Sequence, residues 1–245
     1  MQKRPSFLAV IPARGGSKSV PRKNTKEFLG KPLLAWTVEV ARESGLFDRV
    51  ILSTEDKKIA ETGQAYGAEV PFLRPMELAE DTTLTGPVIR HAVEWLKCHE
   101  AWVPDYVMVL EPTSPARKAF HILESANLIV ESGAESVVSI SELPHHYNPT
   151  KILTLHNDRT ISGFDGTHIK DMVHRRQDLP TYYAFCGIVF GCKTSVLLPE
   201  PFTLWGRHIV GYVVDKRYAL DIDSPEDWVI AETRMRDIQG QTKTC

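Results

Sequence analysis

The stretch Phe-Leu-Ala-Val-Ile-Pro-Ala-Arg-Gly-Gly-Ser-Lys, residues Phe7–Lys18, decides the fold. It begins with a short apolar run that Pro12 ends, which is typical of a buried strand. The glycine pair that follows allows a tight turn in which several backbone N–H groups point into one concavity, where an anion can bind. Because ligands of open α/β sheets bind beyond the carboxyl ends of the strands, this turn predicts a phosphate site.

Basic side chains surround the glycine turn, namely Arg14, Lys18, Arg22 and Lys23. The spacing of the glycines matches neither the P-loop nor the dinucleotide-binding fingerprint. The cations therefore either bind phosphate or belong to a solvated surface turn. Their position after the first strand favours phosphate binding.

Length and composition limit the class of protein. The 245 residues suit one large α/β domain, 1–245, with a small inserted lobe. Lys plus Arg number 29 and Asp plus Glu 31, so no overall field indicates nucleic acid or an acidic membrane as partner. The four cysteines show neither metal-ligand spacing nor a disulfide framework. No apolar run approaches a membrane span or a signal-peptide core, so we expect a soluble cytoplasmic protein.

Strand and helix signals alternate along most of the chain. A helix is expected from Pro32 to Gly45, a strand at 50–53, a helix from Ile59 to Gly67 and a short strand over Glu69–Phe72. Further helices are expected from Thr85, over Phe120–Val130 and after Ser224, which is placed to cap the last helix, and further strands over Asp105–Leu110, Ser136–Ile140, Tyr183–Gly191 and Ile209–Val214. This alternation predicts a doubly wound, mostly parallel sheet.

The segment at about 142–183 interrupts this alternation. It is polar and rich in proline, asparagine and glycine, and we interpret it as a flap or an oligomerisation arm inserted into the domain. Within it, Lys151–Leu155 and Ile169–Val173 are candidate edge strands.

Asp221-Ile222-Asp223 is the second candidate site. Residues two apart in an extended chain point to the same side, so the carboxylates of Asp221 and Asp223 face one way. Two carboxylates suit Mg²⁺, which completes its shell with water and substrate phosphates. The alternative is that Asp223 helps to cap the final helix and Asp221 pairs with a nearby base.

The remaining candidate residues each have two interpretations. Arg74 either contacts a nucleotide bidentately or pairs with Glu77 or Glu80. Glu111, at a predicted strand end, either binds a hydroxyl or fastens its loop. The cations of the irregular segment, Lys151, Arg175 and Arg176, either meet an anionic substrate or are solvated. The thiol of Cys186 is interpreted as a small core group.

Several separated segments together resemble the cytidylyltransferases that make CMP-activated sugar acids, above all the acylneuraminate group. The matching motifs are Ile-Pro-Ala-Arg-Gly-Gly-Ser-Lys (Ile11–Lys18) with Pro-Arg-Lys-Asn (Pro21–Asn24), Leu-Arg-Pro-x-Glu-Leu-Ala-x-Asp-Thr (Leu73–Thr82), Pro-Thr-Ser-Pro-x-Arg (Pro112–Arg117), Arg-Gln-Asp-Leu-Pro (Arg176–Pro180) and Asp-Ile-Asp-Ser-Pro-Glu-Asp (Asp221–Asp227). They run through nearly the whole chain.

The resemblance implies a Rossmann-like nucleotidyltransferase with a dimerisation arm, active as a homodimer. CTP and an acidic sugar are the implied substrates: the anomeric hydroxyl of a sialic-acid-like nonulosonate attacks the α-phosphorus of CTP, and pyrophosphate leaves. Mg²⁺ is the implied cofactor, bound by Asp221 and Asp223. The implied catalytic residues are Arg14, Lys18 and Asp221; the nucleotide site comprises Ala13, Arg14, Gly15, Ser17, Lys18, Lys23, Asn24, Arg74 and Thr85; the acceptor site comprises Glu111, Lys151, Arg176, Gln177 and Cys186.

Two departures from the family pattern concern the acceptor. Glu111 stands where the family commonly has glutamine, and Cys186 stands where asparagine is usual. Transfer of CMP to an eight-carbon ulosonate or a phosphonate therefore stays open beside the nonulosonate. A catalytically idle nucleotide-binding protein is the alternative from another class, whereas an NAD-dependent oxidoreductase lacks its glycine spacing.

Overall fold

A six-stranded sheet forms the centre of the computed structural model, which describes residues 4–172, 175–200 and 203–242. Its strand order is β10-β6-β9-β5-β1-β4. The strands are β1 (Phe7–Pro12), β4 (Arg49–Ser53), β5 (Tyr106–Val109), β6 (Ser136–Glu142), β9 (Tyr183–Lys193) and β10 (Ile209–Val213). β9 runs antiparallel to β5 and β6, while the other pairs are parallel. The predicted mostly parallel sheet is confirmed.

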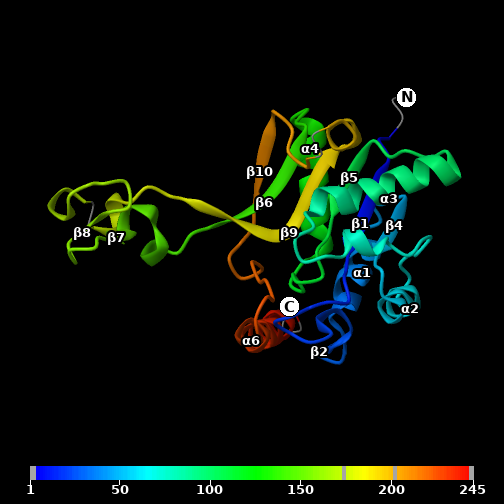
Figure 1. Cartoon of the computed structure of the whole chain (residues 1–245), viewed down its shortest axis with the longest axis horizontal. Coiled ribbons are helices and arrows are strands. Elements are labelled where there is room, and N and C mark those ends of the chain that lie inside the picture. The colour runs from blue at the N-terminus through cyan, green and yellow to red at the C-terminus, as the bar shows by residue number, and fades with distance from the viewer. Residues whose placement is uncertain (1–3, 173–174, 201–202, 243–245) are drawn as a thin grey trace.

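Helices cover both faces of this sheet (Figure 1). These are α1 (Leu33–Glu43), α2 (Lys57–Ala65), α3 (Thr85–Glu100), α4 (Ala119–Glu131) and α5 (Thr194–Leu197), while α6 (Pro225–Thr242) lies beyond one end of the sheet. Strand β1 alternates between the faces: Ala9 and Ile11 pack in the cluster of α1, α2 and α4, whereas Leu8 and Val10 pack with α3 and α5. Because both faces are buried, the strand sequence is continuously apolar.

A third apolar cluster lies beyond one end of the sheet, at the bottom of Figure 1. It fixes the position of the acidic segment, Asp221–Asp223. Val20 and Phe28, just after the glycine turn, pack with Leu220 and Ile222 and with Trp228 of α6. Phe28 belongs to a small hairpin of β2 (Glu27–Phe28) and β3 (Lys31–Pro32). This cluster brings the two ends of the chain together, because it buries side chains from both.

The arm, residues 143–182, leaves the body between β6 and β9 (Figure 1). It contains the hairpin β7 (Leu153–Leu155) and β8 (Ile161–Gly163), with short 3-10 turns over His145–Tyr147, Pro149–Lys151, Ile169–Asp171 and Arg176–Asp178. The expected strand at Ile169–Val173 is wrong over 169–171, because the His168 side chain caps a turn there; Val173 lies outside the described residues. The expected strand at Lys151–Leu155 is confirmed only over Leu153–Leu155.

Two further expectations concern the body. In place of a strand over Glu69–Phe72, Glu69 makes one isolated bridge to Ile51. Ser224 caps α6 as predicted: its Oγ accepts a hydrogen bond from the Asp227 N–H (3.1 Å), and the Asp227 carboxylate accepts one from the Ser224 N–H (2.8 Å). Within the described part of the chain, no helix combines the length and apolarity needed to cross a membrane.

Candidate active site

A cavity of about 350 Å³ opens at the carboxyl edge of β1 and β5. We call it the nucleotide cleft, because it contains residues that the sequence analysis predicts to bind a nucleotide. Predicted site residues from five parts of the chain line it: Arg14, Lys23, Asn24, Arg74, Thr85, Glu111, Asp221 and Asp223. The glycine turn and the acidic segment therefore meet in one cavity, although more than 200 positions separate them in the sequence.

The glycine turn is held from both sides. The Gly15 N–H donates a hydrogen bond to Glu55 Oε1 (2.7 Å), and Asn24 Nδ2 donates to the Arg14 carbonyl (3.0 Å). A Cβ at position 15 would lie 2.7 Å from Asp56 Oδ2, so the close approach of these segments requires glycine. The turn is thus fixed in shape, and Asn24 acts on it by holding the Arg14 carbonyl.

Arg74 is buried beside the turn, with 4% of its surface exposed. Its guanidinium pairs with Glu55 Oε2 at 2.7 Å, so Glu55 joins Arg74 to the glycine turn. The alternative pairing with Glu77 or Glu80 is therefore not found. The Nε of Arg74 has no hydrogen-bond partner among the described residues, although it is buried. A buried unpaired donor is costly, and a ligand in the cleft can satisfy it.

The carboxylate of Asp81 holds two of the cations. Arg14 pairs with Asp81 Oδ1 at 2.7 Å, and Lys18 pairs with Asp81 Oδ2. The Lys18 ammonium, with Arg14, holds the pKa of Asp81 below its usual value. An anion that binds both cations has to replace Asp81.

Lys23 links the glycine-turn segment to the acidic segment. Its ammonium donates to the Ile222 carbonyl (2.7 Å) and to Asp223 Oδ1 (3.1 Å). The backbone N–H of Ile222 donates to the Thr113 carbonyl (3.0 Å), which fastens this segment to the loop after β5. Desolvation in the cleft and the charge of Asp223 raise the pKa of Asp221, although a hydrogen bond with Thr113 opposes them.

Glu111 lies next to Asp221 at the bottom of the cleft. A Cβ at Gly187 of β9 would lie 3.3 Å from Glu111 Oε2, 4.0 Å from Asp221 Oδ2 and 2.7 Å from Ser114 Oγ. Gly187 therefore leaves the space that these side chains share. Burial, with the charge of Asp221, raises the pKa of Glu111 above its ordinary value.

Arg117 is a structural residue whose role the sequence did not indicate. It is 1% exposed and donates to Thr37 Oγ1 (2.8 Å), the Glu111 carbonyl (2.7 Å) and the Gly187 carbonyl (3.0 Å). Burial lowers its pKa to about 10. The sequence marked Arg117 only as the last residue of the Pro-Thr-Ser-Pro-x-Arg motif and gave no indication of its contacts. Arg117 holds the loop after β5 against β9, and so fixes the backbone at Glu111.

Comparison with known proteins identifies the family. A family model described as cytidylyltransferase matches residues 8–159. The chain belongs to the cytidylyltransferase family. It is 32% identical to the pseudaminic acid cytidylyltransferase of Campylobacter jejuni over 92% of this chain and 94% of that protein. It is also 32% identical to the N-acylneuraminate cytidylyltransferase of Escherichia coli, over 94% of this chain and 52% of that protein.

The fold of this cytidylyltransferase is also found among solved structures. A CMP:2-keto-3-deoxy-manno-octonic acid synthetase complexed with CTP superposes with a TM-score of 0.67, covering 96% of this chain and 99% of that one at 18% identity. The Rossmann-like α/β fold expected from the resemblance is confirmed by this similarity, which concerns the fold alone.

The other predicted site residues of the cytidylyltransferase lie outside the nucleotide cleft. Ala13 is buried at the end of β1, while Gly15 and Ser17 shape the turn. Lys151 and Gln177 lie on the arm, and the side chain of Arg176 is outside the described part. Cys186 lines a second cavity that shares Asp221 with the cleft. Burial raises the pKa of its thiol.

The acidic pair is the part of the cleft that suits a divalent cation. Among the described residues, no group of three or more His, Cys, Asp or Glu side chains is arranged to hold a metal. Asp221 and Asp223 line the same cavity, where burial, with the charge of Asp223, raises the pKa of Asp221. Two carboxylates with room for water and phosphate oxygens fit Mg²⁺.

Proposed function

We propose that this cytidylyltransferase transfers CMP from CTP to the anomeric hydroxyl of a sialic-acid-like nonulosonate and releases pyrophosphate. The observation that carries the proposal is the link between Lys23 and Asp223, which brings the cationic turn and the acidic pair into one cleft. The names of the relatives, for pseudaminic acid and N-acylneuraminate, support a sugar acid as acceptor.

The glycine turn, Arg14–Lys18, binds the triphosphate in this proposal. Arg14 and Lys18 exchange Asp81 for phosphate oxygens, while Gly15 and Ser17 shape the backbone around them. The free Nε of Arg74 and the hydroxyl of Thr85 face the same cleft and bind the cytidine. Phosphoryl transfer depends mainly on positioning and on neutralising the charge that spreads over the phosphate oxygens. Fixed cations on a rigid turn provide both.

Asp221 and Asp223 would hold Mg²⁺ in this proposal. The ion would neutralise phosphate charge and orient the triphosphate. Lys23, already paired with Asp223, stays in place to bind a phosphate or the ribose. Glu111 lies beside Asp221 and accepts hydrogen bonds from hydroxyl groups of the acceptor.

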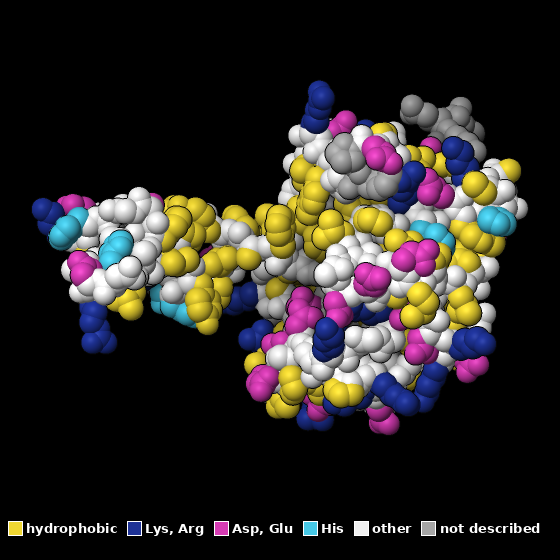
Figure 2. Space-filling view, viewed as in Figure 1, with side chains coloured by type: hydrophobic (Ala, Val, Ile, Leu, Met, Phe, Trp, Pro, Cys, Tyr) yellow, Lys and Arg dark blue, Asp and Glu magenta, His cyan; other side chains and the backbone are white. Residues whose placement is uncertain are grey.

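The arm is proposed to form a homodimer contact, so that Lys151, Arg176 and Gln177 serve the partner's acceptor site. Apolar side chains on the arm support this: Tyr147 is 63% exposed, Leu155 71% and Phe164 56%. Figure 2 shows apolar side chains gathered on the arm and on the neighbouring surface of the body. Exposed apolar patches of this kind mark interaction surfaces.

The test is a pyrophosphate-release assay with CTP, Mg²⁺ and a panel of sugar acids that includes pseudaminic acid, N-acetylneuraminic acid and 2-keto-3-deoxy-manno-octonic acid. We expect turnover with a nonulosonate and its loss in Asp221→Asn. Calorimetry measures CTP binding in parallel. CTP binding without turnover of any acceptor would instead identify a catalytically idle nucleotide-binding protein.

A further inference from the structure

The short segment Thr54–Asp56, which follows β4, is held in place by hydrogen bonds on both sides of Glu55. The Thr54 carbonyl accepts one from the Arg74 N–H (2.8 Å), and the Thr54 hydroxyl accepts one from the Asp56 N–H (3.2 Å). The Asp56 carboxylate caps α2 by accepting from two N–H groups in the first turn of that helix (2.7 and 3.0 Å). Glu55 therefore projects from a fixed backbone.

The carboxylate of Glu55 divides its two oxygens between two partners. Oε1 accepts a hydrogen bond from the Gly15 N–H, and Oε2 accepts one from Arg74 Nη2, both at 2.7 Å. The side chains of Glu55 and Arg74 are 9% and 3% exposed, so this ion pair is shielded from water. Removal of one partner from a buried ion pair leaves the other charge uncompensated, so Glu55 and Arg74 depend on each other.

This division leaves one donor of Arg74 for a ligand. A carboxylate beside a guanidinium commonly accepts two parallel hydrogen bonds from it. Glu55 accepts only one from Arg74, because its other oxygen binds Gly15, and the buried Nε of Arg74 has no partner among the described residues. Since Arg74 lines the nucleotide cleft, the bond between Glu55 and Gly15 keeps this donor available there.

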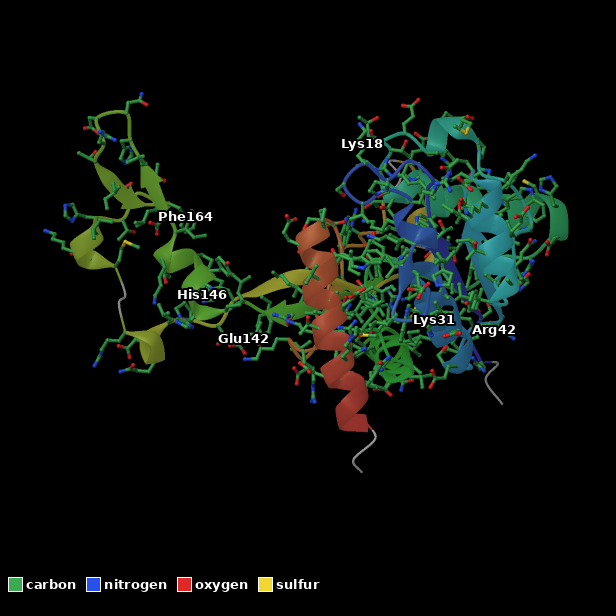
Figure 3. All side chains as sticks on the ribbon, turned by 90° about the horizontal axis from the view of Figure 1, so that it is seen from below. Lys18, Lys31, Arg42, Glu142, His146 and Phe164 are labelled. Atoms are coloured by element: carbon green, nitrogen blue, oxygen red, sulfur yellow. The ribbon has the colours of Figure 1, made fainter. Side chains whose placement is uncertain are left out.

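The same carboxylate limits which groups of the glycine turn can bind phosphate. The Gly15 N–H is bound to Glu55, and the Ser17 N–H donates to the Gly15 carbonyl (3.0 Å). These two backbone donors are occupied, so the cations Arg14 and Lys18 carry more of the binding. Lys18, labelled in Figure 3, has a side chain that is 81% exposed, whereas Glu55 supports the turn from its buried side.

We infer, on the basis of the proposed function, that Glu55 is a positioning residue that couples the two halves of the nucleotide site. Through Arg74 it orients the donor for the cytidine, and through Gly15 it fixes the turn for the triphosphate. Glu55 is not one of the described residues that line the cleft, so it acts through these two residues. Because one side chain holds both, its loss weakens both halves together.

Two variants of Glu55 remove its contacts to different degrees. Glu55→Ala removes both hydrogen bonds. Glu55→Gln keeps the length of the side chain and one acceptor oxygen, but its NH2 group then faces either the Gly15 N–H or the Arg74 guanidinium, both of which are donors. Glu69→Ala is the matched control, because Glu69 also pairs with an arginine, Arg49 (2.8 Å), and neither is among the described residues that line the cleft.

Calorimetry with CTP and with inorganic tripolyphosphate, each with Mg²⁺, tests the inference without turnover. Tripolyphosphate measures binding to the turn alone, and the additional affinity of CTP measures the contribution of Arg74. We expect Glu55→Ala to raise the Kd for tripolyphosphate roughly threefold and the Kd for CTP roughly tenfold. Glu55→Gln should lie between wild type and Glu55→Ala for CTP, and Glu69→Ala should match the wild type. Thermal unfolding verifies that each variant is folded.

The outcomes separate this inference from the proposed reaction. Equal loss of affinity for the two ligands, or unchanged binding of tripolyphosphate, in folded Glu55→Ala overturns the coupling. If that variant does not fold, unchanged CTP binding by Glu55→Gln overturns it, as does a wild type that binds neither ligand. In steady-state assays the KM for CTP should rise while the KM for the sugar acid stays the same, which a loss of folded protein does not produce. CTP binding that depends on Glu55, without pyrophosphate release, overturns the proposed function and leaves the coupling in place.

Discussion

The carboxylate of Asp81 neutralises the same two cations, Arg14 and Lys18, that are proposed to bind the triphosphate. Its pairs with Arg14 and Lys18 lie at the surface, with Lys18 largely exposed. Surface ion pairs of this kind contribute little, so a triphosphate can replace them readily. In the proposed function, Asp81 nevertheless competes with the nucleotide for both side chains.

Replacing Asp81 by asparagine should therefore strengthen CTP binding. We expect the Kd for CTP, measured by calorimetry at low salt, to fall roughly threefold, and the difference to shrink as salt screens the charges. Glu80→Gln serves as control, because Glu80 lines the same cleft, whereas Arg14 and Lys18 pair with Asp81. Weaker binding by Asp81→Asn would show that Asp81 instead holds the site in shape.

Gly187 allows a steric test of the site around Glu111 and Asp221. Alanine at this position would place a Cβ 2.7 Å from Ser114 Oγ and 3.3 Å from Glu111 Oε2. We expect kcat for CMP transfer to fall at least tenfold, since a small displacement of reacting groups is costly. Ser114 Oγ has no hydrogen-bond partner in the described part, so Ser114→Ala should relieve the closest contact. The double variant should recover activity; if it does not, the closest contact is not the cause.

Helix α4 carries a buried histidine that makes the stability of the enzyme depend on pH. His121 is 1% exposed, and its Nδ1 accepts a hydrogen bond from the Lys118 N–H at 3.0 Å. Burial, together with the nearby charge of Arg117, lowers its pKa to about 4. The imidazole is therefore neutral in the folded enzyme at neutral pH.

Acid should destabilise the enzyme through His121. An unfolded histidine titrates near pH 6.5, so its protonation below that value favours the unfolded chain. The contribution is fully present above about pH 6.5 and is lost as the pH falls toward 4, by up to roughly 3 kcal/mol. Urea unfolding of wild type and His121→Gln between pH 7 and 4 measures this, with the exposed His146→Gln as control. Parallel pH profiles for wild type and His121→Gln would contradict the assignment.

Elements whose sequence pattern lies within a few neighbouring residues were predictable from the sequence. The apolar run of β1, the capping residues of α6 and the glycine turn each carry their pattern within a few residues. The turn over Ile169–Asp171 was mistaken for a strand, because the His168 cap, and not the apolar residues, decides it. Boundaries that depend on single side-chain caps are weakly marked in the sequence.

Contacts between distant segments were not predictable in the same way. Glu55 joins Gly15 to Arg74, and Arg117 joins the loop after β5 to β9, yet each residue looks like an ordinary surface charge in the sequence. The family resemblance predicted several of the positions that line the cleft. It did not identify these supporting residues, because their role appears only when the sheet brings the segments together.

At the scale of the whole molecule, the arm should control assembly. Leu155→Glu places a charge on a side chain that is 71% exposed on an apolar hairpin. We expect sedimentation velocity to show a dimer for the wild type and a monomer for this variant. CTP binding should be unchanged, whereas the KM for the acceptor should rise, because Lys151 and Gln177, which are proposed to serve the partner's acceptor site, would no longer reach it. His156→Glu, on the same hairpin region, is the control for added charge. A monomeric wild type would remove the dimer from the proposal.

The shared position of Asp221 has a kinetic consequence. Asp221 borders both cavities, so in the proposed reaction the charge that an acceptor meets beside it depends on whether nucleotide and cation already cover this carboxylate. An anionic sugar entering first faces a bare negative group, whereas one entering second faces a neutralised one. We therefore expect an ordered sequence in which CTP precedes the sugar and the activated sugar departs after pyrophosphate.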